Sequence, residues 1–217
     1  MSRRLRTIVQ IASLVLFIVL LKAGRAQDWM KVVLATVVLA IPFGRFYCGW
    51  ICPTNTLMRV SDWIGKKLKV KVDRIPKVLR PGWVPYVLLV LLVASFVLNA
   101  RRGVKLPFIV ILSALAFVLT LRYRPEVWHR YLCPFGVLYG VTGRFALLSM
   151  RVNERCTGCG LCRRVCPGEA VTIESNRASI GPQYCLECLD CIALCRRDAI
   201  TYGLPSGEVG TPVSPHT

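Results

Sequence analysis

Eight cysteines toward the C-terminal end of the sequence are the residues best suited to redox or metal chemistry. They form two runs with the same spacing, C-x₂-C-x₂-C-x₃-C: first Cys156, Cys159, Cys162 and Cys166, then Cys185, Cys188, Cys191 and Cys195. A C-x₂-C-x₂-C loop can place three thiolates around one face of an iron–sulfur cube, and in this pattern the fourth thiolate comes from the other run. The spacing therefore predicts two [4Fe–4S] clusters.

The exchange of the fourth ligand divides the eight thiols into two sets. Cluster 1 is predicted to use Cys156, Cys159, Cys162 and Cys195, and cluster 2 to use Cys185, Cys188, Cys191 and Cys166. Zinc sites use pairs of C-x₂-C rather than triplets, and disulfides are rare on a cytoplasmic face. Iron–sulfur clusters with all their iron bound by protein sulfur indicate electron transfer rather than substrate turnover.

The residues around the two runs agree with this interpretation. Gly158 and Gly160 allow the backbone to bend close to the sulfurs. Short β-type segments follow each run, at Ala170–Glu174 and Ile200–Tyr202. Arg196 stands where the second run would be expected to have a proline, and since proline is not a ligand we expect a local change only.

Three further cysteines and one histidine form two related motifs earlier in the chain. Cys48 and Cys52 belong to a C-x₃-C-P motif, and His129 and Cys133 to an H-x₃-C-P motif that lies 81 residues later. The match predicts an internal two-fold repeat of two helices and a motif. Thiolates and imidazole suit a third iron–sulfur cluster or another soft metal. A redox or metal-handling role for the thiols and a purely structural role are the alternatives.

Four apolar runs account for most of the first 150 residues: Thr7–Leu21, Val32–Phe43, Tyr86–Leu98 and Pro107–Leu121. Each is shorter than the ~20 residues that span a bilayer comfortably. Four almost uncharged runs in series nevertheless favour transmembrane helices over the buried helices of a soluble all-α domain. The first run resembles both a cleavable signal peptide and a retained anchor, and we expect an anchor.

The basic residues belong to this apolar part of the chain. Residues 1–150 carry 22 Lys/Arg and 4 Asp/Glu, residues 151–217 carry 7 of each, and the net charge is +18. Because the basic residues flank apolar runs, they favour a membrane over nucleic acid as the partner. Basic residues are in excess before the first run, in a long loop expected at 59–80, and after the fourth run. This excess predicts that both chain ends, the 59–80 loop and the cysteine runs are cytoplasmic. An apolar content of 54% excludes a disordered chain.

Three regions are therefore predicted. Residues 1–150 form an α-helical membrane domain with four transmembrane helices, 151–203 a small α+β dicluster ferredoxin domain of bacterial type, and 204–217 a flexible tail. Phe135–Met150 is expected to be an interfacial or re-entrant segment. The sequence contains no G-x-G-x-x-G motif and no P-loop, so a stand-alone enzyme is not predicted.

Together these motifs resemble the membrane polyferredoxins of the NapH, NosR and MauN type. The resemblance covers nearly all of residues 1–203, and it is carried by Arg45-Phe-Tyr-Cys-Gly-Trp-Ile-Cys-Pro53, the second Cys-Pro and the dicluster segment. It implies a multi-pass protein of the bacterial inner membrane that passes electrons between the quinone pool, its clusters and a partner redox enzyme. The chain departs from the family at His129, where these proteins generally have a cysteine.

The leading prediction is an electron-transfer subunit of an oxidoreductase complex, with lipid, quinone or quinol and other subunits as partners. His129, Trp50 and Tyr131 are candidate quinone contacts, and a titratable His129 is suited to accept a proton that quinol releases. The alternative is an assembly or maturation factor, in which the membrane thiols bind or reduce a metal ion for a partner enzyme.

Overall fold

The computed structural model describes residues 3–25, 28–72, 82–102 and 108–204. It forms two compact units that alternate along the chain: one contains Met1–Val33 and Trp50–Leu138, the other Leu34–Gly49 and Tyr139–Thr217. The second unit thus combines the cysteine-rich segment with part of the N-terminal region, a combination that the predicted boundary at residue 150 does not include. The predicted tail lies outside the described residues from position 205 onward.

The described residues of all four apolar runs are helical, as predicted. They correspond to α1 (Arg3–Lys22), α2 (Asp28–Phe43), α5 (Val84–Arg102) and α6 (Phe108–Arg122). Among the described residues, α1 is the one helix whose length and composition suffice to cross a membrane, while α5 and α6 contain shorter apolar segments.

Shorter helices follow α2 and α6 in the same order. α3 (Phe46–Trp50) and α4 (Pro53–Lys67) come after α2, and α7 (Pro125–Tyr131) and α8 (Pro134–Gly143) come after α6. Both α4 and α8 begin at the proline of a Cys-Pro motif, since proline at the first helical position loses no hydrogen bond and has a suitable φ. The expectation of a loop over 59–80 is therefore wrong for residues 59–67, which belong to α4; residues 73–80 lie outside the described part.

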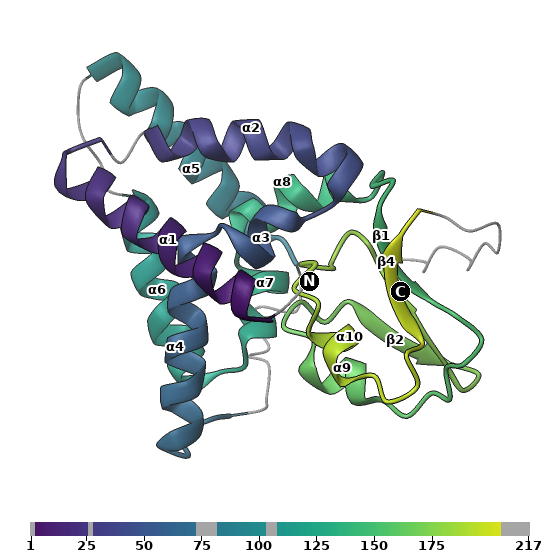
Figure 1. Ribbon diagram of the computed structural model, residues 1–217. Coiled ribbons are helices and arrows are strands. Elements are labelled where there is room, and N and C mark those ends of the chain that lie inside the picture. The colour runs from purple at the N-terminus through teal and green to yellow at the C-terminus, as the bar shows by residue number, and fades with distance from the viewer. Residues whose placement is uncertain (1–2, 26–27, 73–81, 103–107, 205–217) are drawn as a thin grey trace. The chain divides into compact units, whose positions relative to one another are not determined.

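Within the first unit, α4 lies alongside α6 through small and polar side chains (Figure 1). The Ser61 hydroxyl donates to the carbonyl of Phe117 at 2.6 Å, and the hydroxyls of Thr54 and Ser113 are 2.8 Å apart. A Cβ at Gly65 would lie 2.3 Å from the carbonyl oxygen of Leu121. Close approach over small residues, with hydroxyls bonded across the interface, is typical of helix pairs in membranes.

Lys71 holds the end of α6 to the chain that leaves α4. Its ammonium group donates to the carbonyls of Thr120 and Tyr123, the latter at 2.8 Å, and it pairs with Asp62 at 2.8 Å. The last carbonyls of a helix lack partners within the helix. Lys71, from the segment after α4, supplies a donor to the carbonyls at the end of α6, and its charge offsets the dipole of that helix.

The second unit contains two small antiparallel sheets. β1 (Ser149–Val152) pairs with β4 (Ile200–Gly203), and β2 (Val171–Glu174) pairs with β3 (Arg177–Ile180). The predicted strands near 170–174 and 200–202 are confirmed as β2 and β4. The segment Phe135–Met150 contains most of α8 and the start of β1, and its interfacial or re-entrant position stays a prediction.

The two halves of this unit repeat each other 29 residues apart. α9 (Leu161–Val165) and α10 (Asp190–Leu194) occupy equivalent positions in the two halves and pack against each other. β2 and β4 also occupy equivalent positions. The core between them contains apolar side chains and cysteines: Met150, Cys162, Ala170, Val171, Ala178, Cys185 and Ile200. Each cysteine run thus contributes one buried sulfur to this core, Cys162 from the first run and Cys185 from the second.

Residues 44–49, which follow α2, contact the turn formed by residues 183–188, and Phe43 at the end of α2 contacts β4. Arg45 Nη1 donates to the carbonyl of Gln183 at 2.7 Å, and the Tyr202 hydroxyl donates to the carbonyl of Phe43 at 3.1 Å. A Cβ at Gly49 would lie 2.2 Å from the carbonyl oxygen of Leu186. The first Cys-Pro motif therefore contributes Gly49 to the wall around the second cysteine run.

We expect Gly49→Ala to destabilise the protein by about 1–3 kcal/mol, because the added methyl group overlaps a backbone oxygen. Gly140→Ala is the matched control, since its Cβ would be 3.4 Å from the carbonyl oxygen of Gln183, an ordinary contact. Thermal unfolding followed by circular dichroism in detergent compares the two variants. Equal apparent melting temperatures would contradict the proposed role of the contact.

Candidate iron–sulfur site

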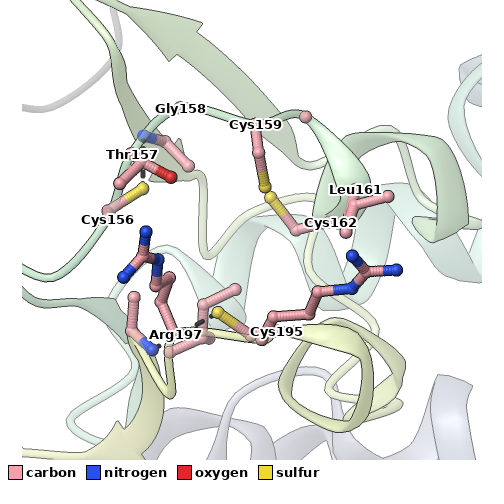
Figure 2. A pocket seen from close by; sticks show the side chains of 13 residues that line it. Cys156, Thr157, Gly158, Cys159, Leu161, Cys162, Cys195 and Arg197 are labelled. Carbon is pink, nitrogen blue, oxygen red and sulfur yellow. Dashed lines mark hydrogen bonds between the residues drawn. The ribbon is translucent and has the colours of Figure 1, made fainter.

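Four cysteines from the two runs line a single cavity in the second unit. Figure 2 shows that the sulfurs of Cys156, Cys159, Cys162 and Cys195 surround it. Its volume is about 170 Å³, and Thr157, Leu161 and Arg197 are among the other residues that line it. This is the set that the sequence assigns to cluster 1, with three thiols from the first run and one from the second.

Backbone amides donate to the sulfurs at equivalent places in the two halves. The amide of Ala170 donates to Cys166 Sγ and that of Ala199 to Cys195 Sγ, both at 3.3 Å. The amide of Ala178 in β3 donates to Cys156 Sγ at 3.4 Å. Such hydrogen bonds stabilise a thiolate and tune the potential of an iron–sulfur cluster.

The other four cysteines also lie near one another. Burial raises the pKa of the Cys185 thiol well above its ordinary value, and the neighbouring Cys188 and Cys166 add to this effect. Burial and then Cys166 raise the pKa of Cys191 to about 12. Cys166 of the first run thus interacts electrostatically with Cys185 and Cys191 of the second run.

These thiols suit a cationic metal group. Burial and mutual repulsion oppose deprotonation of several cysteines at one place, and bound metal supplies the positive charge that offsets both effects. The cavity, the sulfur donors and the amides directed at them fit a [4Fe–4S] cluster held by Cys156, Cys159, Cys162 and Cys195. Within the described residues, no three His, Cys, Asp or Glu side chains are placed to hold a single metal ion.

The turns that carry the sulfurs need left-handed backbone conformations. Gly158 and Gly160 have φ of 65° and 78°, and their counterparts Glu187 and Leu189 have φ of 52° and 61°. A Cβ at Gly158 would also lie 2.7 Å from the backbone of Asn176. Glycine adopts this conformation at little cost, whereas a residue with a Cβ pays about 1–2 kcal/mol.

Glu187 is a buried carboxyl group between Cys185 and Cys188. Its side chain packs against Gly44, where a Cβ would be 1.9 Å from Glu187 Oε1. Burial raises the pKa of Glu187 to about 8, although a hydrogen bond with Tyr202 and the charge of Arg45 act in the opposite direction. Sequence reasoning did not find this group, because a glutamate in a polar turn is usually exposed.

The three cysteines and the histidine of the two Cys-Pro motifs are all buried, and they are divided between the two units. Cys52, His129 and Cys133 belong to the first unit, and Cys48 belongs to the second. His129 Nε2 lies 3.2 Å from Asn55 Oδ1. Asn55 comes three residues after Cys52 in α4, and the sequence analysis did not single it out.

Two family models match the chain. One is described as a 4Fe-4S binding domain and matches residues 26–71 and 106–153, the parts that contain the Cys-Pro motifs. The other is described as a 4Fe-4S dicluster domain and matches residues 149–196. No solved structure matches the chain.

Relatives among characterised and uncharacterised proteins share most of the chain. An uncharacterised protein of Methanocaldococcus jannaschii is 32% identical over 76% of this chain and 67% of its own length. The ferredoxin-type protein NapH of Escherichia coli is 26% identical over 78% of this chain and 65% of its own length. The methylamine utilization ferredoxin-type protein MauN of Methylorubrum extorquens is 33% identical over 57% of this chain and 47% of its own length.

The cysteine-lined cavity, the duplicated fold and the matching models define an iron–sulfur protein of the ferredoxin type, with a role in electron transfer. More particularly, the chain belongs to the NapH/MauN family of polyferredoxins. It spans about two thirds of the length of the first two relatives and about half of the MauN protein.

Pairs of cysteine substitutions test how the ligands are shared. Cys159 and Cys195 line one cavity, so the double variant Cys159→Ser/Cys195→Ser should lose one cluster, about four irons. Cys159→Ser/Cys188→Ser should lose two clusters, about eight irons. Iron and acid-labile sulfide, measured on anaerobically purified protein, distinguish the variants. Loss of both clusters in the first variant would show that each run holds its own cluster.

Proposed function

We propose that this chain is an integral membrane iron–sulfur subunit that transfers electrons between the quinone pool and a partner redox enzyme. The observation that carries the proposal is the cavity shared by three cysteines of the first run and Cys195 of the second. Two [4Fe–4S] clusters held by the eight cysteines would supply one-electron carriers. The ferredoxin-type names of the relatives support the same role.

Exposed apolar side chains support the membrane location. α1 exposes Ile8, Ile11 and Val15, and α5 exposes Val90 and Val93. Large apolar surfaces on several helices are costly in water and favourable in lipid. With basic residues concentrated at 59–80 and near both ends of residues 1–150, the cysteine-rich segment is on the cytoplasmic side in this proposal.

A third cofactor site at the Cys-Pro motifs is part of the proposal. The 4Fe-4S binding model matches the chain in two pieces, and each piece contains one motif. Cys48, Cys52 and Cys133 would supply thiolates and His129 an imidazole. Oxygen acceptors commonly orient a metal-bound histidine through its other ring nitrogen, and Asn55 Oδ1 at 3.2 Å is placed to do so.

Iron content separates two and three clusters. We expect about twelve irons per chain, falling to about eight in Cys52→Ser, because each [4Fe–4S] group contains four. Electron paramagnetic resonance of the dithionite-reduced protein identifies the group that is lost. A wild-type value of about eight would leave the motif cysteines without a cluster, and zinc in place of iron would overturn the whole proposal.

His129→Gln tests the link to quinone. If the iron content shows that the Cys-Pro motifs hold no cluster, His129 is not a ligand and can accept the proton that quinol releases. Removing its titratable ring should then slow reduction of the iron–sulfur absorbance by a short-chain quinol about 10²-fold or more, as expected for a lost general base. Reduction by dithionite should be unchanged. His216→Gln is the matched control, since these are the two histidines of the chain. Equal quinol rates in both variants would exclude His129 from this role.

A further inference from the structure

Four arginines directly follow two ligands of the first cysteine set in the sequence. Arg163 and Arg164 follow Cys162 directly, and Arg196 and Arg197 follow Cys195 directly. All four are exposed. They make up four of the seven basic residues in 151–217, although this region has no net charge.

The second cysteine set has no such residues at the equivalent positions. Cys191 is followed by Ile192 and Ala193, and Cys166 by Pro167 and Gly168. The two halves have the same order and spacing of helix and strand, so the difference in charge between the two sites comes from their side chains. The positive charge therefore distinguishes one of two otherwise similar sites.

The arginines and the cavity occupy the same region of the second unit. Arg196 and Arg197 line the cavity, and Figure 2 shows Arg197 beside Cys195. α9, which carries Arg163 and Arg164, packs against α10. Within the described part of the chain, none of the four forms an ion pair with a carboxylate.

Exposure of the sulfur ligands also differs between the two sets. Cys159, at this cavity, is the exposed member of the eleven cysteines, all of which the structure describes. Cys185 in the other set is buried, and residues 44–49 cover the adjoining turn through Arg45 and Gly49. A partner can therefore reach the first set from solvent at Cys159, whereas no cysteine of the second set is exposed.

We infer that the cationic face made by Arg163, Arg164, Arg196 and Arg197 around Cys159 is a docking surface for an acidic protein that exchanges electrons with this chain. The inference rests on the proposed function and names the chemistry of the partner. Charge complementarity of this kind directs encounter and raises association rates by 10–10³-fold, with strong dependence on salt.

A protein partner suits this face better than the other polyanions. Sites for single-stranded nucleic acid interleave basic residues with aromatic rings, and residues 156–166 and 188–198 contain no aromatic residue. A lipid surface would cover the exposed Cys159 and leave no access for a redox partner. The four guanidinium groups are suited to paired hydrogen bonds with carboxylates.

Binding of fluorescent poly-L-glutamate to the full-length, cluster-loaded protein in detergent tests the surface. Fluorescence anisotropy at low salt should show binding that Arg164→Glu/Arg197→Glu weakens about tenfold or more, and that salt abolishes. Arg144→Glu is the control for a single charge reversal, because Arg144 is exposed in the same unit and does not line the cavity. Arg197→Glu alone should weaken binding, whereas Arg144→Glu should not.

Small oxidants of opposite charge give a second readout of the same face. Ferricyanide should oxidise the dithionite-reduced wild type faster than Arg164→Glu/Arg197→Glu at low salt, and hexaammineruthenium(III) should show the reverse order. Iron content and circular dichroism of each variant establish that the clusters and the fold are retained. Neutral Arg164→Gln/Arg197→Gln should lie between wild type and the reversed variant.

Several results would overturn the inference. Unchanged polyglutamate binding in the reversed variant would place the interaction elsewhere, and loss of ferricyanide access in phosphatidylglycerol nanodiscs would assign the face to lipid. Tighter binding of oligo-dT than of polyglutamate would assign it to nucleic acid. Absence of iron from the wild type would instead refute the proposed function, so the two failures are distinguishable.

Discussion

Cys195 has to reach a cavity built mainly by residues 156–162, and much of the second unit follows from this requirement. The strand β4 begins five residues after Cys195 and pairs with β1, which ends four residues before Cys156. The amide of Asn153 donates to the carbonyl of Ala199 at 2.9 Å, immediately beside this pairing. The sheet thus joins the end of the second run to the start of the first, and the short helices α9 and α10 bring the remaining sulfurs inward.

The same unit shows why the Cys-Pro motif and the cysteine runs belong together. Gly49 belongs to the first Cys-Pro motif, yet it contacts the turn of the second cysteine run. Arg45, from the same short stretch, donates to Gln183. The sequence of this segment suggested a cofactor site at the membrane. The segment also packs against the turn of the second cysteine run, so Gly49 and Arg45 have a packing role apart from any metal chemistry.

The sequence predicted the long apolar helices well, and it predicted the short strands and the helix α4 poorly. The apolar runs became α1, α2, α5 and α6, because a sustained lack of charge leaves a helix as the favourable structure. β1 and β3 were not predicted, since each has four residues and only part of each strand is buried. α4 was hidden in a region interpreted as a basic loop, although Thr54, Ser61 and Gly65 mark its contact face.

Candidate site residues were predictable where chemistry fixes the spacing, and less so where packing decides. The four cysteines around the cavity follow from the C-x₂-C-x₂-C pattern and the exchanged fourth ligand, and the structure brings them together. Glu187 and Asn55 have no such spacing rule. Their positions depend on residues far away in the chain, Gly44 and His129, which no local pattern connects to them.

The unequal residues at the left-handed positions make the two turns depend differently on the rest of the unit. Gly158 and Gly160 adopt their conformation almost freely, so the first turn can assemble by itself. Glu187 and Leu189 pay about 1–2 kcal/mol each in the same conformation, and contacts from Gly44, Arg45 and Gly49 surround their turn. The shape of the second turn therefore depends on residues 44–49, from a distant part of the chain, whereas the glycines of the first turn need no such support.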